Sequence, residues 1–256
     1  MSCHRLLQTN VNHSARAQDL LFQTMAEWNI EVAIVAEPYV AEPYAVSSAD
    51  NRWRGDTAGL VAIVSKGGSA ASSLVPLSRG EGYVACRWGS RAIVGVYISP
   101  NISPEEFETQ IEEVEEVVRR LQPGWVLVAG DFNARSVDWA GPVTDTMGEL
   151  LGDWAAALDL HVVNRGSVPT CVAARGSSIV DITMGSPKAH GEITEWSVSD
   201  EETLSDHRYI VMEVSLPSPV REPCARPERP EGAPSPRWSL KHLDRDLAMT
   251  AAIAKS

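Results

Sequence analysis

The sequence predicts an α/β protein, and two kinds of segment support this prediction. Short apolar, partly β-branched runs have the length and composition of buried strands. Between them, several segments place apolar residues at helical spacing, two of them behind a residue suited to cap a helix. The chain has 256 residues, which is enough to bury a substantial core in one or two domains.

The most informative stretch is residues 125–134, WVLVAGDFNA. Trp125 to Ala129 are predicted to form a fully buried strand, and Gly130 ends it. Asp131 and Asn133 follow at the point where a strand gives way to a loop, so the sheet holds their backbone while their side chains can reach a substrate. An isolated Asp-x-Asn after a strand is more often only a turn, so the interpretation depends on the rest of the chain.

The N-terminal half is predicted to contain one helix among several strands. Ser14 can cap the helix, in which apolar residues recur at helical spacing as far as Trp28. Residues 41–58 are predicted to form a loop. The predicted strands of this half are residues 6–12, 32–36, 60–64, 83–88 and 92–98.

A second helix has a strong start at Ser103-Pro104, with Glu106 three residues after the capping serine. Its apolar stripe runs from Phe107 to Leu121, and Pro123-Gly124 ends it. The helical pattern returns over residues 147–158, and further strands are predicted over residues 161–164, 179–184 and 207–215.

The composition changes after the last strand. Residues 217–236 hold 7 of the 16 prolines and no apolar periodicity, which predicts a solvated linker. Residues 237–256 resume a weak helical pattern. We therefore predict a domain over residues 1–216, a linker over 217–236 and the beginning of a further segment over 237–256 of a longer protein.

Charge and cysteine content limit the possible partners. The chain has 22 basic and 34 acidic residues, and residues 1–216 alone carry a net charge of −14, which excludes binding of polyanions by bulk attraction. Four widely spaced cysteines favour reduced thiols in an intracellular reducing environment. No apolar run of about 18 residues and no signal-peptide pattern occur, so no membrane partner is expected.

Polar or ionisable residues stand at the ends of the predicted strands. Each has a structural explanation on its own, as a turn residue, a cap or a residue at the edge of the core. Together they form a pattern that a scaffold of apolar strands would present at one site. The set is Asn10, Asn12, Glu37, Tyr97, Asp131, Asn133, Asp181, Asp206 and His207.

This set of side chains suits hydrolysis of a phosphodiester. Hard oxygen ligands such as Glu37 and Asp206 could hold Mg²⁺. His207, aligned by Asp181 or by Asp206, could accept the proton of the attacking water. Asn10, Asn133 and Tyr97 could donate hydrogen bonds to the phosphate oxygens. Motifs for competing chemistries, namely a P-loop, a nucleophile elbow and an H-E-x-x-H helix, do not occur.

The spaced motifs resemble those of the endonuclease/exonuclease/phosphatase superfamily, whose fold is a four-layer α/β sandwich of two packed, mainly antiparallel sheets flanked by helices. The resemblance covers residues 6–215. Its motifs are QTNVN (8–12), AEP (36–38), VYISP (96–100), GDFNA (130–134), SIVDIT (178–183) and SDH (205–207).

Within this superfamily, Tyr97 is the residue type of apurinic and retrotransposon endonucleases. SIVDIT and LSDHRYI (204–210) resemble the endonuclease domain of non-LTR retrotransposons, in the clade that inserts into ribosomal RNA genes or telomeric repeats. The proline-rich tail and Pro236-Arg237-Trp238 resemble the connection to a downstream reverse transcriptase.

The resemblance implies that Glu37 is the principal ligand of Mg²⁺, for which Mn²⁺ can substitute, and that Asp206 supports the metal side. Asn12 stands where the repair enzymes have an aspartate, so its ligation of the metal is in question. Glu42, in a repeat of the Glu-Pro-Tyr sequence, is the alternative to Glu37. Ser177 to Val180 replace the aromatic abasic-site pocket of repair enzymes, which weakens a repair function.

The resemblance also implies that Asn10 and Asn133 orient the phosphate and that Tyr97 donates to it. Asp131 is implied to position the nucleophilic water or to assist the leaving group. Asp181 is implied to orient His207, which acts as a general base or contacts the phosphate.

The resulting hypothesis is a Mg²⁺-dependent endonuclease that nicks double-stranded DNA and acts in the nucleus. By resemblance, the nick leaves a 3′-hydroxyl that primes target-primed reverse transcription by a fused reverse transcriptase, at a ribosomal RNA gene or other repeat sequence. Predicted DNA contacts are Arg135, Thr170, Arg175 and Ser178. The alternatives are an abasic-site repair endonuclease or small-molecule phosphodiesterase of the same fold, and a catalytically decayed DNA-binding module.

Overall fold

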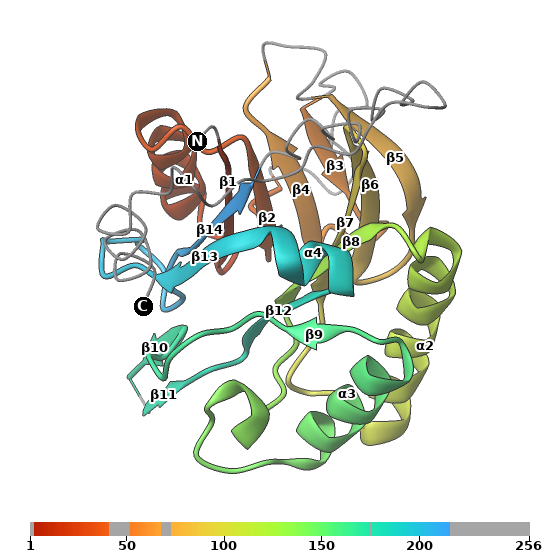
Figure 1. Ribbon diagram of the computed structural model, residues 1–256. Coiled ribbons are helices and arrows are strands. Elements are labelled where there is room, and N and C mark those ends of the chain that lie inside the picture. Colours follow the sequence, from red (N-terminus) through yellow and green to blue (C-terminus); the bar gives the residue numbers. More distant parts are fainter. Residues whose placement is uncertain (1–2, 41–51, 68–72, 175, 216–256) are drawn as a thin grey trace, which may run out of the picture. The chain divides into compact units, whose positions relative to one another are not determined.

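A computed structural model describes residues 3–40, 52–67, 73–174 and 176–215. Two six-stranded sheets pack face to face, with helices on their outer faces. In Figure 1, helix α1 lies beside β1 and β2, while α2 and α3 lie together on the opposite side of the view. The predicted four-layer α/β sandwich is confirmed.

The first sheet is built around two parallel strands. Strands β1 and β2 are parallel because α1 (Ala15–Glu27) returns the chain to the same edge, and every other neighbouring pair is antiparallel. Its strand order is β13 (Ile193–Val198), β14 (Ile210–Ser215), β1 (Cys3–Asn10), β2 (Val32–Ala36), β4 (Val61–Ser65) and β3 (Trp53–Gly55).

The second sheet repeats this plan. Strands β7 and β8 are parallel and joined by α2 (Pro104–Leu121), and the other pairs are antiparallel. Its order is β5 (Leu74–Arg79), β6 (Tyr83–Trp88), β7 (Arg91–Tyr97), β8 (Trp125–Asp131), β12 (Asp181–Gly185) and β9 (His161–Val162). The remaining elements are the β10–β11 hairpin (Cys171–Ala173, Gly176–Ser178), α3 (Thr146–Ala157), α4 (Pro187–Glu192) and a 3₁₀ turn, η2 (Val137–Trp139).

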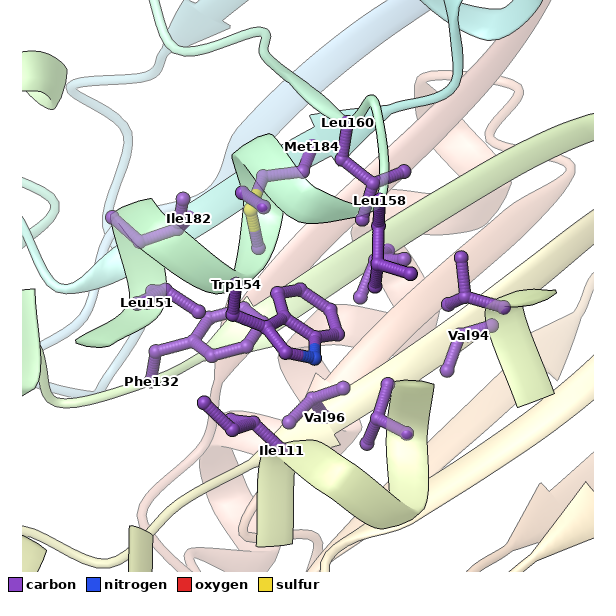
Figure 2. Close-up of a cluster of buried hydrophobic side chains, with 14 of the residues drawn as sticks. Val94, Val96, Ile111, Phe132, Leu151, Trp154, Leu158, Leu160, Ile182 and Met184 are labelled. Atoms are coloured by element: carbon purple, nitrogen blue, oxygen red, sulfur yellow. The ribbon is translucent and has the colours of Figure 1, made fainter. Parts of the chain in front are cut away.

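Three hydrophobic cores separate the four layers. One lies between the two sheets, one between the first sheet and α1, and one between the second sheet and the helices α2 and α3. In the last of these, Trp154 and Leu151 of α3 lie near Phe132 and the side chains of β12 (Figure 2). Between the sheets, a Cβ on Gly95 would come within 3.2 Å of Ile34, so a glycine there lets the sheets approach closely.

The helix caps are the ones predicted from the sequence. The Ser14 hydroxyl accepts a hydrogen bond from the Ala17 amide, and Ser103 and Glu106 form a reciprocal capping box at the start of α2. In the part of the chain that the structure describes, no helix is long and apolar enough to cross a membrane.

Several predicted boundaries are wrong. The first strand ends at Asn10 rather than Asn12, and the last begins at Ile210, so His207 lies in the preceding loop. The region predicted as loop contains β3, and strands β5, β10, β11 and β13 were not predicted. Residues 41–51 and 216–256 lie outside the described residues, so the linker and the segment after it remain predictions.

Candidate active site

The topology brings the predicted strand-end residues to one edge of the sandwich. Asn10 ends β1 and pairs with the last residue of β2, directly before Glu37. Tyr97 and Asp131 end the parallel pair β7 and β8 and are register partners. Asp181 starts the antiparallel strand β12 opposite Asp131, so it lies at the same edge.

A first cluster is centred on Glu37. Asn10 Nδ2 donates to Glu37 Oε2 at 2.9 Å, and the Tyr97 hydroxyl donates to Glu37 Oε1 at 2.7 Å. His13 Nε2 lies 3.5 Å from the same Oε1 atom. Burial, followed by the hydrogen bond to Glu37, raises the pKa of Tyr97, so its hydroxyl remains a donor at neutral pH.

The backbone at Glu37 is unusual. Its φ of 45° lies in the left-handed region, which a glutamate seldom adopts. Strained backbone of this kind is found where a side chain must be aimed at a ligand. The conformation turns a carboxylate that is still partly exposed, at 20 % of its side-chain surface, out of the strand toward Asn10 and Tyr97.

A second cluster lies deeper, around Asp131. Its Oδ2 accepts from Asn10 Nδ2 at 3.0 Å and its Oδ1 accepts from the Asn133 amide at 3.1 Å. The side chain of Asn133 donates to the carbonyl of Ile98 at 2.9 Å. Burial and the charge of Asp181 raise the pKa of Asp131 above its ordinary value of 3.8.

Asp181 and His207 form a buried pair at the centre of this second cluster. His207 Nδ1 lies 2.8 Å from Asp181 Oδ2, and His207 Nε2 lies 3.8 Å from Asp131 Oδ2. Burial alone would lower the pKa of His207, but the two carboxylates outweigh it and raise the pKa well above 6.5. The structure thus pairs His207 with Asp181, one of the two partners that the sequence left open.

Asp206 forms another group with Cys171 and His207. One ligand atom from each of Cys171, Asp206 and His207 lies within 4.8 Å of the others. Ser205 fixes the loop, since its hydroxyl accepts from the His207 amide at 3.2 Å and donates to the Asn10 carbonyl at 2.9 Å.

The residues present fit a divalent cation. Asp131 and Asp181 are almost fully buried within reach of a single basic side chain, His207, and Asp181 Oδ1 has no hydrogen-bond partner among the described residues. Glu37 adds a partly exposed carboxylate nearby through Asn10, which bonds both Glu37 and Asp131. This surplus of carboxylate oxygens is the donor set that Mg²⁺ prefers.

Among the described residues, the side chain of Asn12 forms no hydrogen bond with either cluster. Its backbone amide donates to Asn10 Oδ1 at 2.7 Å, and its φ is 48°. Because asparagine tolerates this left-handed turn well, the turn itself accounts for the residue type. A direct ligation of metal by Asn12 therefore remains a prediction.

One buried polar residue of the site was missed by the sequence analysis. Gln8 Nε2 donates to the carbonyls of Gly130 at 3.0 Å and Ile182 at 3.3 Å, and its Oε1 accepts from the Thr183 hydroxyl at 2.8 Å. The Trp196 indole donates to the same hydroxyl. Only the spacing of Gln8 two residues before Asn10, on the same face of β1, could have indicated it.

The predicted DNA contacts have different outcomes. Arg135 and Ser178 line a pocket of about 470 Å³ that also reaches Asn133, Cys171 and His207. Arg175 lies outside the described residues.

The contact of Thr170 with DNA stays a prediction, and in this structure the residue has no exposed surface. Its hydroxyl accepts from the amides of Val180 and Asp181, both at 3.2 Å, so it holds the start of β12 in place.

Comparisons with known proteins point to one family. A family model described as "Endonuclease-reverse transcriptase" matches residues 92–211. The chain is 27% identical over 155 residues to the "Retrovirus-related Pol polyprotein from type-1 retrotransposable element R1" of Bradysia coprophila, an alignment that covers 57% of this chain. The chain spans only 15% of the length of that polyprotein.

Solved structures share the fold. The "Endonuclease domain of TRAS1, a telomere-specific non-LTR retrotransposon" is 27% identical, with a TM-score of 0.69, over 83% of this chain and 98% of that chain. An AP endonuclease from Archaeoglobus fulgidus is similar in fold, with 14% identity and a TM-score of 0.61, over 83% of this chain and 100% of that one.

The two-sheet fold and the strand-end site define a nuclease of the endonuclease/exonuclease/phosphatase superfamily. Within that superfamily, the chain is similar to the endonuclease domains of non-LTR retrotransposons.

Proposed function

We propose that this chain is a Mg²⁺-dependent DNA endonuclease that nicks one strand of a target duplex and leaves a 3′-hydroxyl. That hydroxyl would prime reverse transcription by a reverse transcriptase fused to it in the full-length protein, in the nucleus. The single observation that carries the proposal is the convergence of Asn10, Glu37, Asp131, Asp181 and His207 at one edge of the sandwich.

The roles of the side chains follow from their geometry. A bound Mg²⁺ would neutralise negative charge on the phosphate, and Glu37 is the residue we expect to hold it, with Asp206 as the predicted support. Tyr97 and Asn10, which bond Glu37 in this structure, would donate to the phosphate oxygens. Asn133, whose amide bonds Asp131 and whose φ is 50°, would help to orient the phosphate.

Proton transfer is best assigned to the buried cluster. His207 is held by Asp181 and has a raised pKa, so it suits a cationic contact to the phosphate better than a general base. Asp131 also has a raised pKa, which makes it a better proton acceptor than an ordinary carboxylate. We therefore assign Asp131 to positioning the attacking water and taking its proton.

Nicking of supercoiled plasmids tests this proposal. One plasmid would carry a ribosomal RNA gene segment and a second would carry telomeric repeats, because the two similar retrotransposon proteins are an R1 element and a telomere-specific element. We expect relaxation in Mg²⁺ and none with chelator or with Asp181→Ala. The matched control is Asp153→Asn, an exposed carboxylate on α3 that should leave nicking unchanged.

The products separate the alternatives. Mapped 3′ ends that gather at one site support a targeted endonuclease. Scattered nicks would support the endonuclease activity but contradict specificity for a target sequence. Faster cleavage of an abasic duplex than of an intact duplex would favour a repair enzyme. Absence of metal-dependent nicking in every substrate would point to a small-molecule phosphodiesterase or to a decayed binding module.

A further inference from the structure

His207 belongs to a second set of metal-binding side chains, together with Cys171 and Asp206. Cys171 comes from the β10–β11 hairpin, and Asp206 and His207 come from the loop before β14. Their ligand atoms lie within 4.8 Å of one another, and none of the roles derived above involves the thiol.

The backbone holds these three residues in place. Cys171 and His207 are partners in an antiparallel bridge between the two segments. On either side of this bridge, the Val172 amide donates to the Asp206 carbonyl at 2.7 Å and the Arg208 amide donates to the Thr170 carbonyl at 2.8 Å. The approach of the thiol to the imidazole is therefore set by backbone pairing rather than by flexible side chains.

A thiolate, an imidazole and a carboxylate form a ligand set for Zn²⁺ rather than for Mg²⁺. Tetrahedral Zn²⁺ with bonds of about 2.0–2.3 Å places its ligand atoms roughly 3.3–3.6 Å apart, so a contraction of at most about 1.5 Å would close the site. His207 already has its other ring nitrogen fixed by Asp181, which is the outer-sphere partner that zinc-binding histidines usually have.

We propose that Cys171, Asp206 and His207 form an inhibitory site for Zn²⁺, which differs from the oxygen-ligand site at Glu37 in its thiol and imidazole ligands and shares Asp206 with it. Cys171 and His207 line the pocket of about 470 Å³ beside the reacting groups, so a hydrated ion can reach them from solvent. Three protein ligands leave the fourth position to water. The inhibitory part rests on the proposed nuclease function, because an ion bound here would withdraw His207 from the phosphate and Asp206 from the Mg²⁺.

Binding is measured on the metal-free full chain, without reference to activity. Zn²⁺ affinity is determined by competition with a chromophoric chelator, and Cd²⁺ is used as a spectroscopic probe, since a cysteine ligand produces thiolate-to-metal charge-transfer absorbance. Loss of an outer-sphere partner alone weakens metal binding about 10–100-fold, so Cys171→Ser, which removes a direct ligand, should weaken Zn²⁺ binding at least about 10-fold and abolish the absorbance.

The matched control is Cys3→Ser. Cys3 is an exposed thiol beside the carboxylate of Glu213, so it resembles Cys171 in having an acidic neighbour but belongs to no cluster of three ligand groups among the described residues. This variant should retain both the affinity and the absorbance. An unchanged affinity in Cys171→Ser, or a Cd²⁺ spectrum lost in Cys3→Ser instead, would overturn the proposed site.

Inhibition is measured next, as Zn²⁺ titrations of plasmid nicking at fixed Mg²⁺, with each protein normalised to its own rate without Zn²⁺. Wild type and Cys3→Ser should be inhibited at the same concentration of Zn²⁺, and Cys171→Ser should need at least about 10-fold more. Tight, Cys171-dependent binding without inhibition would overturn the inhibitory role alone. If the protein does not nick at all, the binding data still decide whether the site exists.

Discussion

Gln8 on one sheet and Gly130 on the other are joined directly, because the Gln8 carboxamide donates a 3.0 Å hydrogen bond to the Gly130 carbonyl. Gly130 has no room for a side chain, since a Cβ there would lie 1.8 Å from the Val96 carbonyl oxygen. Gln8 also bonds the carbonyl of Ile182. The three strands joined in this way end or begin at Asn10, Asp131 and Asp181, so the bond fixes the distance between the reacting groups.

We predict that Gln8→Met, which keeps the length of the side chain, lowers both stability and activity. The substitution leaves the buried carbonyls of Gly130 and Ile182 without this partner, and an unsatisfied buried group costs about 1–3 kcal/mol. Urea unfolding measures that loss, and the nicking rate should fall while the affinity for DNA changes little.

Gln23→Met is the control for Gln8→Met. Gln23 is an exposed residue of α1 that bonds only Glu27 among the described contacts, so its replacement should change the free energy of unfolding by no more than about 0.5 kcal/mol. Equal effects of the two substitutions would show that Gln8 has no special role in joining the sheets.

The sequence predicted the central strands and missed five others, three of which lie at the edges of the two large sheets for a physical reason. Strands such as β8 are buried on both faces and form continuous apolar runs. Strands β3, β5 and β13 each lie at the edge of a sheet, where part of the strand is exposed and the apolar run is interrupted. Pro76 lies inside β5, which is tolerated because an edge strand need not donate every backbone hydrogen bond.

The site residues could be predicted where the strand before them could be predicted. Asn10, Glu37 and Asp131 were found because each follows an apolar run, and the parallel pairing of two sets of strands then brings them together. The contact of Gln8 with Gly130 could not be predicted, since it depends on how two sheets pack rather than on local pattern. For the same reason Thr170 was taken for a surface residue, although tertiary packing buries it.

We predict that Tyr97→Phe reduces nicking by about 10²-fold, the loss that follows removal of one hydrogen-bond donor from a developing oxyanion. The ring would remain packed, so the fold should be retained, but Glu37 would lose its 2.7 Å hydrogen bond. Steady-state nicking rates over a range of Mg²⁺ concentrations measure the effect.

Tyr83→Phe provides the comparison for Tyr97→Phe. Tyr83 is equally buried in the same sheet, and its hydroxyl contacts Ser78 at 3.4 Å, away from the site. It should keep almost full activity. If both tyrosine variants lost activity to the same degree, the effect would come from packing and the assignment of Tyr97 as a donor would fail.

We predict that the metal-free protein binds duplex DNA weakly at physiological salt. Residues 1–216 have a net charge of −14, so bulk attraction is absent and binding must come from local contacts such as Arg135 in the pocket. Fluorescence anisotropy with Ca²⁺, Mg²⁺ or chelator would measure this. Arg135→Ala should weaken the metal-supported complex, whereas Arg119→Ala, on the exposed face of α2, should not. Tight binding in chelator would contradict the prediction.

The stability of the metal-free protein should fall as the pH rises above 6.5. The pKa of His207 is raised in the folded protein because the charges of Asp181 and Asp131 outweigh the cost of burial. Its contribution is therefore fully present below 6.5, the unfolded value, and is lost as the pH rises through the folded value. The raised pKa of Asp131 also makes stability fall as the pH rises above 3.8, because the folded state holds the proton of Asp131 more tightly than the unfolded state does.

Urea unfolding in chelator at a series of pH values would test this dependence. Asp181→Asn removes the closest charge from His207 and the repulsion felt by Asp131, so the fall in stability with pH should become much shallower. Asp153→Asn, remote on α3, should keep the wild-type slope. Two outcomes would contradict this prediction: a wild-type stability that does not change with pH, or the same fall in stability with pH in Asp181→Asn. Either would mean that the Asp181–His207 pair does not cause the pH dependence of stability. The proposed cationic contact of His207 with phosphate would then lose its physical basis.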